Sequence, residues 1–533
     1  MDDVVIRGGL IIDGSGTEAR RADLAIRDGR ITAIAPDYPG QGRKTVDASG
    51  LVVAPGFIDI HTHSDFTLPL NARAESKIRQ GVTTEVLGNC GYSVAPTLPG
   101  KVAMLRDYLA SSAPWLEFHP TSFADYLDAF PPVAVNTVMQ VGHNTLRLMA
   151  IGLEDRPARP DELATMERLL EEGLEAGALG LSTGLFTAPG AYAPPEELAA
   201  LGRVLRRHGA GYASHIRDEA NHVFDAVREA IALGEASDVH VQIAHLKLSG
   251  TDNWGGAERL LDEIDAARRR GVRVDCDQYP YTSGSNPLRN LLPAWVQAGG
   301  QQAMLRRLAE PATRDRIRRE IDARGLNNFG RIGSWDAVRI AVSPHLMEHA
   351  GRTIGDLARE RGCDGLDMAC DYVIEDRGET RILVESMAEA DVQTIVRSPQ
   401  ILVGSDGPNV APYGITGQGK PHPRLYGTFA RVLGHYSRDL GLLPLPQAIH
   451  KMTGGAAAAL SLRERGFLRE GYWADVTVFD PATIAERATF DNPHRYAAGI
   501  STVLVNGVVV IDGGEHAGAL PGRVLSRSAS GVG

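Results

Sequence analysis

The feature that most constrains the fold is a repeated alternation of short apolar runs and amphipathic segments through the middle of the chain. Apolar runs bounded by turn residues indicate buried strands, and the segments between them have helical spacing. Residues 195–209, for example, begin at a proline and end at a glycine, as helices commonly do. Eight such units predict an α/β protein with a (β/α)8 barrel, whose active site lies at the carboxyl ends of the strands. The eight predicted strands are residues 56–61, 83–88, 134–142, 178–183, 211–215, 239–245, 272–278 and 401–406.

The two ends of the chain have a different pattern, that of β-hairpins. Near the start, Asp28 and Gly29 form a turn dipeptide within the β-rich run "DLAIRDGRITAI". Near the end, Asn506 and Gly507 stand in the same way inside "STVLVNGVVVIDGG". We therefore predict one small β-domain built from both termini, residues 1–54 with 464–520.

The barrel is predicted to span residues 55–463, with one long interruption. Residues 286–400 separate the seventh strand from the eighth, and this interval is far longer than an ordinary βα loop. It predicts an inserted subdomain with several helices that forms a lid over the site. The last segment, 521–533, is polar and rich in serine, and we expect it to be disordered.

Composition excludes several classes of function. A chain of 533 residues with a formal net charge of -11 lacks the basic patches that bind nucleic acid or acidic membranes, so we expect small-molecule partners. No stretch approaches the roughly 18 apolar residues of a membrane span. The start "MDDVV" is acidic, unlike a secretory signal, and the four cysteines follow no disulfide pattern, so a cytoplasmic protein with reduced thiols is expected. No oligomeric state is predicted.

Metal-capable side chains recur where the predicted strands end. Taken singly, each has a structural interpretation: a histidine pair that only makes hydrogen bonds, a buried thiol that packs as a small hydrophobe, or an aspartate in an Asx-turn. Their coincidence at one rim of the barrel favours a metal site instead. These residues are His61, His63, Cys90, His215, His245 and Asp406.

Zinc is the ion that best suits a set of imidazoles with one thiolate. Cys90, His215 and His245 would supply three protein ligands and leave the fourth position to water, which is a catalytic arrangement. Asp406, at the end of the eighth predicted strand, is expected to take a proton from that water and pass it to a leaving amine. His143 also lies at a predicted strand end, and we interpret it as a structural hydrogen-bonding residue.

The motifs as a set resemble the D-aminoacylase family, the N-acyl-D-amino-acid deacylases of the amidohydrolase superfamily. The resemblance extends from residue 1 to about residue 515. Its motifs in this chain are "GFIDIHTHSD", "GNCG", "ALGLSTGL", "SHIRDE", "HLK", "DQYPYTSGS", "VGSDG", "PHPRLYGTF" and "KMTGGAAAAL".

The resemblance implies a specific set of roles. One zinc ion is expected to be bound tightly by Cys90, His215 and His245, and a second position at His61 and His63 is expected to be weak or empty. Asp406 is expected to act as general base and acid. The residues that match the family's contacts to the substrate α-carboxylate are Lys247, Tyr279, Ser285 and Arg424, although a segment rich in glycine and proline, 407–420, separates Asp406 from Arg424.

The expected reaction is zinc-dependent hydrolysis of an N-acyl-D-amino acid to a carboxylate and a free D-amino acid. Two alternatives remain open. A cyclic amidase of the dihydroorotase or hydantoinase kind would use the same barrel but would need the α-carboxylate contacts less. A non-catalytic scaffold with the amidohydrolase fold would be expected to have lost its metal ligands.

Overall fold

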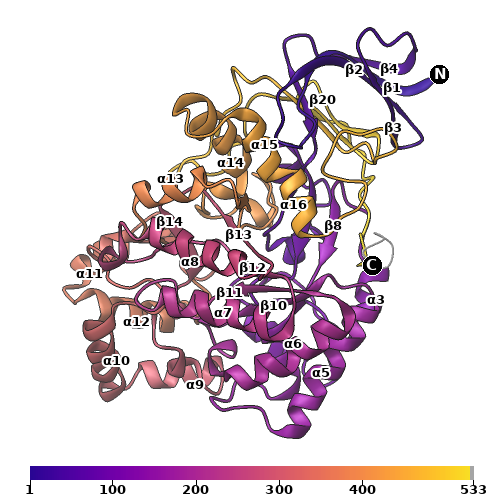
Figure 1. Cartoon of the computed structure of the whole chain (residues 1–533). Helices are drawn as coiled ribbons and strands as arrows, with labels where there is room; N and C mark the ends of the chain where they lie inside the picture. The colour runs from indigo at the N-terminus through magenta and orange to yellow at the C-terminus, as the bar shows by residue number, and fades with distance from the viewer. Residues whose placement is uncertain (528–533) are drawn as a thin grey trace.

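The computed structural model describes residues 1–527, and Figure 1 shows the course of the chain. All eight predicted barrel strands are present, and every pairing between neighbours is parallel. They are β6 (Phe57–Asp59), β7 (Val82–Leu87), β8 with β9 (Asn136–Met139 and Val141–Gly142), β10 (Gly180–Gly184), β11 (Gly211–His215), β12 (Val241–Ile243), β13 (Val274–Gln278) and β17 (Ile401–Val403).

The strands close into a ring in two runs. The third strand is interrupted at Gln140, so that β8 pairs with β7 while β9 pairs with β10. At the other junction, a parallel bridge joins Thr62, beyond β6, to Gly407, beyond β17. The backbone N–H of Asp406 also donates to the carbonyl of His61 at 2.9 Å. All eight carboxyl ends therefore meet at one rim, which confirms the predicted barrel.

Helices cover the outside of the ring. The predicted helix at 195–209 is α6, and Gly209 ends it in the left-handed conformation with a φ of 58°. The helices of the barrel and of the segments that follow it are α1 (Glu75–Ile78), α2 (Val102–Leu109), α3 (Phe123–Asp128), α4 (His143–Ala150), α5 (Pro160–Glu175), α6 (Pro195–His208), α7 (Val223–Ser237), α8 (Ala257–Arg269), α13 (Glu389–Arg397), α14 (Arg424–Arg431), α15 (Leu445–Met452) and α16 (Gly454–Ala459).

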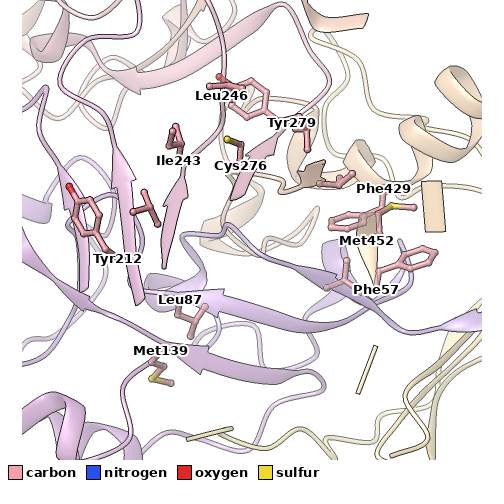
Figure 2. Close-up of a cluster of buried hydrophobic side chains, with 14 of the residues drawn as sticks. Phe57, Leu87, Met139, Tyr212, Ile243, Leu246, Cys276, Tyr279, Phe429 and Met452 are labelled. Carbon is pink, nitrogen blue, oxygen red and sulfur yellow. The ribbon is translucent and has the colours of Figure 1, made fainter. Parts of the chain in front are cut away.

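The main hydrophobic core is built from strand residues and from the helices that face them. Figure 2 shows part of it, with Leu87 and Met139 on the neighbouring strands β7 and β8 and Ile243 on β12. Phe57 of β6 stacks on Phe429 of α14, with ring centroids 5.9 Å apart. Strands buried on both faces are often rich in apolar residues, as β17 is with Ile401, Leu402 and Val403.

Both ends of the chain form one nine-stranded sheet, visible apart from the barrel in Figure 1. Its N-terminal and C-terminal halves join where β5 pairs antiparallel with β18. Both predicted hairpin turns are present, because Asp28–Gly29 and Asn506–Gly507 have the positive φ angles of a type I′ turn. The strands are β1 (Asp2–Ile11), β2 (Arg20–Arg27), β3 (Arg30–Ala35), β4 (Gly42–Asp47), β5 (Val52–Pro55), β18 (Val476–Phe479), β19 (Ile500–Val505), β20 (Val508–Asp512) and β21 (Glu515–His516).

The segment between β13 and β17 has a hydrophobic core of its own. Its helices α9 to α12 lie together away from the terminal sheet (Figure 1). It also holds a three-stranded antiparallel sheet in the order β14-β16-β15, which the sequence did not predict. The elements are β14 (Ser283–Pro287), α9 (Gln301–Leu308), α10 (Pro311–Arg324), β15 (Val338–Val342), α11 (Ile354–Arg361), α12 (Gly365–Glu375) and β16 (Arg381–Glu385).

The expected disorder of segment 521–533 is wrong for its first part. Gly522 donates to the carbonyl of Val133, and Val524 forms a parallel bridge with Thr137, so that 521–527 extend the edge of the barrel at β8. Backbone pairing outweighs the polar composition here. The rest of the segment lies outside the described residues, and the domain limits at 54, 286–400 and 463 stay a prediction.

Within 1–527, every helix is too short or too polar to cross a bilayer.

Candidate active site

The turns that follow the strands hold the chemically important side chains in strained backbone conformations. Cys90, His245 and Asp406 all have positive φ angles, of 54°, 37° and 48°. Such angles are uncommon for residues with a Cβ and gather at functional sites. The turn at Cys90 is bounded by glycines, and a Cβ added to Gly88 would lie 2.2 Å from the Gln140 carbonyl oxygen. Only glycine therefore fits the position that brings the Cys90 thiol to the rim.

The structure brings all six predicted metal-capable side chains together. They form two groups whose ligand atoms lie within 4.8 Å of one another, and Cys90 belongs to both. Its Sγ is 3.2 Å from His61 Nε2 and 3.5 Å from His245 Nε2. In the group that contains His61, His63 Nε2 is 3.1 Å from Asp406 Oδ1. The two groups are Cys90 with His215 and His245, and Cys90 with His61, His63 and Asp406.

The environment of Cys90 favours a thiolate. Burial opposes the charge, but the imidazoles of His61 and His245 and a hydrogen bond with His215 hold the pKa of the Cys90 thiol well below its ordinary value. A thiolate is the form of cysteine that binds metal. Cys276, by contrast, is fully buried on β13, and burial raises the pKa of its thiol.

Asp277 is a buried carboxylate behind the cluster that the sequence did not single out. Its Oδ1 is 3.4 Å from His61 Nδ1 and accepts the backbone N–H of His245 at 2.9 Å. The carboxylate therefore faces the ring nitrogen of His61 that points away from Cys90. Carboxylates in this place fix the tautomer and orientation of metal-binding histidines.

Glu219 is a second such carboxylate, and it too was missed. Its Oε1 is 2.9 Å from His245 Nδ1, and its Oε2 accepts a hydrogen bond from Asn328 Nδ2 at 2.8 Å. The ammonium of Lys247 also donates to Glu219. The only signal in the sequence is that Glu219 follows His215 by four residues, and its Oε2 is 3.5 Å from His215 Nε2.

Asp406 is oriented by groups on two sides. Arg424 Nη1 is 2.9 Å from its Oδ2, across the connecting segment 407–420. Burial disfavours the carboxylate, but Arg424, His245 and a hydrogen bond with His63 hold the pKa of Asp406 well below its usual range.

The turn that carries Asp406 is fastened from below by a buried ion pair. Lys77 Nζ is 2.8 Å from Asp59 Oδ2 and also donates to the Gly407 carbonyl at 2.9 Å. Asp59 Oδ1 in turn accepts the backbone N–H of Ser405 at 2.9 Å. Both side chains are fully buried, so this network fixes the residues on either side of Asp406.

A cavity of about 350 Å³ opens above the cluster. This volume is within the range of small-molecule sites. Its wall includes Ser285 and Arg424 among the four residues expected to contact a substrate carboxylate. Lys247 and Tyr279 lie behind this wall, where the Lys247 ammonium is 5.3 Å and the Arg424 guanidinium carbon 4.4 Å from the centre of the Tyr279 ring. The metal-capable residues on the cavity are His63, Cys90, His215, His245 and Asp406.

His143 takes no part in the cluster. Its Nε2 is 2.8 Å from Glu197 Oε1, and Arg147 pairs with the other oxygen of the same carboxylate. All three side chains are buried. The structural interpretation of His143 is therefore confirmed.

Comparison with known proteins places the chain among enzymes of one family. The model of the amidohydrolase family matches residues 44–511. The chain is 40% identical to the D-aminoacylase of Alcaligenes xylosoxydans xylosoxydans, over 99% of this chain and 98% of that protein. It is 39% identical to an N-acyl-D-aspartate deacylase of the same organism, over 98% of this chain and 95% of that protein.

A solved structure agrees in fold over nearly the whole chain. It is that of N-acyl-D-glutamate deacylase from Bordetella bronchiseptica, complexed with zinc and a phosphonate inhibitor that mimics the tetrahedral intermediate of the reaction. The two share 37% identity and a TM-score of 0.83, over 98% of this chain and 99% of that one. With a ligand cluster at the barrel rim and a family match over most of its length, this chain belongs to the amidohydrolase family.

Proposed function

We propose that the protein is a zinc-dependent deacylase of N-acyl-D-amino acids. The observation that carries the proposal is the pair of ligand groups that share Cys90 and open onto a cavity, which the ion pair of Asp406 and Arg424 also lines. The full-length similarity to D-aminoacylase and to N-acyl-D-aspartate deacylase supports the same reaction class.

The donor set suits one tightly held zinc ion. Cys90, His215 and His245 offer one sulfur and two nitrogen ligands, and Glu219 and Asp277 back the two sides of the cluster. His61 and His63 would form a weaker second position, because His63 is already engaged with Asp406. Zinc supplies Lewis acidity, which polarises a carbonyl and makes bound water acidic near neutral pH.

Asp406 is the residue that we assign to proton transfer. Its carboxylate lies on the cavity and is ionised because Arg424 and the histidines favour the charge. It can therefore accept a proton from attacking water and return it to the departing amide nitrogen, which leaves as the free amino group. The buried pair of Lys77 and Asp59 keeps the backbone on both sides of this carboxylate in place.

The α-carboxylate of the substrate is assigned to the side of the cavity that holds Arg424 and Ser285. Arg424 Nε is buried without a hydrogen-bond partner among residues 1–527, so this guanidinium has donor capacity left after its contact with Asp406. Guanidinium groups bind carboxylates in a planar, bidentate way. Tyr279 packs between Arg424 and Lys247 and orients both cations, while Glu219 neutralises Lys247.

The test is a panel of initial rates with the zinc-loaded enzyme. We expect release of free amino acid from N-acetyl-D-methionine, much slower release from the L-isomer, and no opening of dihydroorotate or hydantoin rings. Ring opening faster than hydrolysis of every linear amide would instead establish a cyclic amidase. A zinc-loaded protein that converts none of these compounds would contradict the enzymatic proposal and leave the scaffold alternative.

A further inference from the structure

One cation on the cavity wall has no place in the proposed reaction. Arg381 is the first residue of β16, the middle strand of the inserted sheet. Its pairing partners on the two neighbouring strands are Pro287 and Val342, and all three residues line the cavity above the cluster. A charged side chain is thus placed in the middle of a wall that the insertion supplies.

Arg381 lacks an acidic partner. Its guanidinium donates from Nη1 to Ser112 Oγ at 2.9 Å. Among residues 1–527 no carboxylate oxygen lies within 4.0 Å of its guanidinium, whereas Arg424 on the same cavity is paired with Asp406. Burial and the charge of Arg424 lower the pKa of Arg381 to about 10, so it is still a cation at neutral pH. Partly buried cations without a counter-ion are costly, and an anionic ligand would remove that cost.

Arg381 lies on the strand next to that of Ser285, which is expected to contact the α-carboxylate of the substrate. In the register of β14 and β16, Pro287 faces Arg381 and Ser285 faces Leu383. Residues two apart on a strand share a face, so Ser285 and Arg381 are diagonal neighbours on one face of the sheet. Such neighbours lie about 7 to 8 Å apart, which suits two carboxylates on one small molecule.

The rest of the cavity favours the amino-acid side chain over the acyl group as the source of that second carboxylate. The part of the wall that reaches solvent is mainly apolar, because Pro114, Met347 and Ile415 are exposed there and Gln418 is the polar residue beside them. Phe66 and Trp115 continue this apolar wall inward. An acyl chain can lie along these residues, whereas Arg381, the cation of the cavity wall that pairs with no carboxylate among residues 1–527, adjoins Ser285 on the face of the inserted sheet.

We propose that Arg381, with Ser112, binds the side-chain carboxylate of the substrate and makes the enzyme selective for acidic N-acyl-D-amino acids. The inference rests on the proposed deacylase function and names its substrate class. It assigns Arg381 to substrate selection and gives it no part in the proton transfer of Asp406.

The experiment compares kcat/KM of the zinc-loaded parent and of Arg381→Met for N-acetyl-D-glutamate, N-acetyl-D-aspartate and N-acetyl-D-alanine. We expect the parent to prefer an acidic substrate. We also expect Arg381→Met to lose about 10- to 100-fold on that substrate, while it changes less than about 2-fold on the alanine derivative, because a charge-assisted hydrogen bond is lost only with the acidic substrate. Arg381→Lys should retain part of the preference, which separates loss of charge from misfolding.

The matched control is Arg339→Met, which removes a guanidinium from β15 of the same sheet that is paired with Asp491 at 3.0 Å. It should leave the substrate preference unchanged. Equal losses on acidic and neutral substrates in Arg381→Met would overturn the proposal, and so would a parent that prefers neutral side chains. N-succinyl-D-alanine forms a separate arm, and dependence on Arg381 in that arm alone would assign the site to the acyl group and contradict the side-chain assignment. If no N-acyl compound reacts at all, it is the deacylase function that fails.

Discussion

Replacing Glu219 by glutamine tests whether the carboxylates behind the cluster set its affinity for zinc. Glu219 is 3% exposed and contacts His215, His245, Asn328 and Lys247. Glutamine keeps the shape of the side chain but removes its charge, which leaves Lys247 without a counter-ion and His245 Nδ1 with a weaker partner. Loss of such a partner costs about 10- to 100-fold in metal affinity, or about 1.4 to 2.7 kcal/mol.

The assay is competition for zinc between the protein and a chelator of known affinity, with circular dichroism to verify folding. The matched control is Glu197→Gln, since Glu197 is equally buried and bonded to a histidine at the end of another strand, but that histidine, His143, belongs to no ligand group. We expect a weakened zinc affinity in Glu219→Gln alone. Equal zinc affinities in the parent and both variants would refute the assignment of Glu219.

Three further predictions concern catalysis and stability. Asp406→Asn should retain its zinc and lose about 100- to 10,000-fold in kcat, because the proton acceptor is removed; full activity in a zinc-loaded variant would remove Asp406 from the mechanism. Lys77→Met should lower the free energy of unfolding in a denaturant titration by about 3 to 5 kcal/mol, because Asp59 would be left buried and unpaired. The control is Lys44→Met at the exposed pair with Asp512, which should lower the same free energy by less than about 1 kcal/mol. Burial lowers the pKa of Lys451 to about 7 in the folded protein, whereas a lysine in the unfolded chain has a pKa of about 10.4. Between these two pH values the unfolded state binds more protons than the folded state. The free energy of unfolding should therefore rise with pH across that range. Lys451→Met should reduce this pH dependence of stability, which thermal unfolding at pH 7 and pH 10 measures. An equal pH dependence in the parent and the variant would contradict the role given to Lys451.

The sequence predicts the elements whose pattern is local. The strand at 272–278 was visible because Val272, Val274 and Cys276 alternate with polar residues. The turn at Asp28–Gly29 was visible because these residues suit a type I′ turn. The short strand β14 was not, because "SGSNP" has neither alternation nor apolar character, and only its partner β16 makes it a strand.

The candidate site divides in the same way. His61, Cys90 and Asp406 were predictable because a barrel brings the ends of its strands to one rim. The roles of Asp277 and Glu219 depend on which ring nitrogen each faces, and that is decided by packing between distant segments. Arg381 was likewise unpredictable, since nothing near it in the sequence shows that it reaches the cavity or that it lacks an acidic partner.

The zinc content and activity of Cys90→Ala test the central claim most directly. Cys276→Ala is the matched control, because Cys276 is also a buried thiol on a barrel strand but lies in neither ligand group. We predict one tightly bound zinc ion per chain and hydrolysis of an N-acyl-D-amino acid in the parent and in Cys276→Ala, and loss of both in Cys90→Ala. A folded Cys90→Ala variant that keeps its zinc and its rate of hydrolysis would contradict the account.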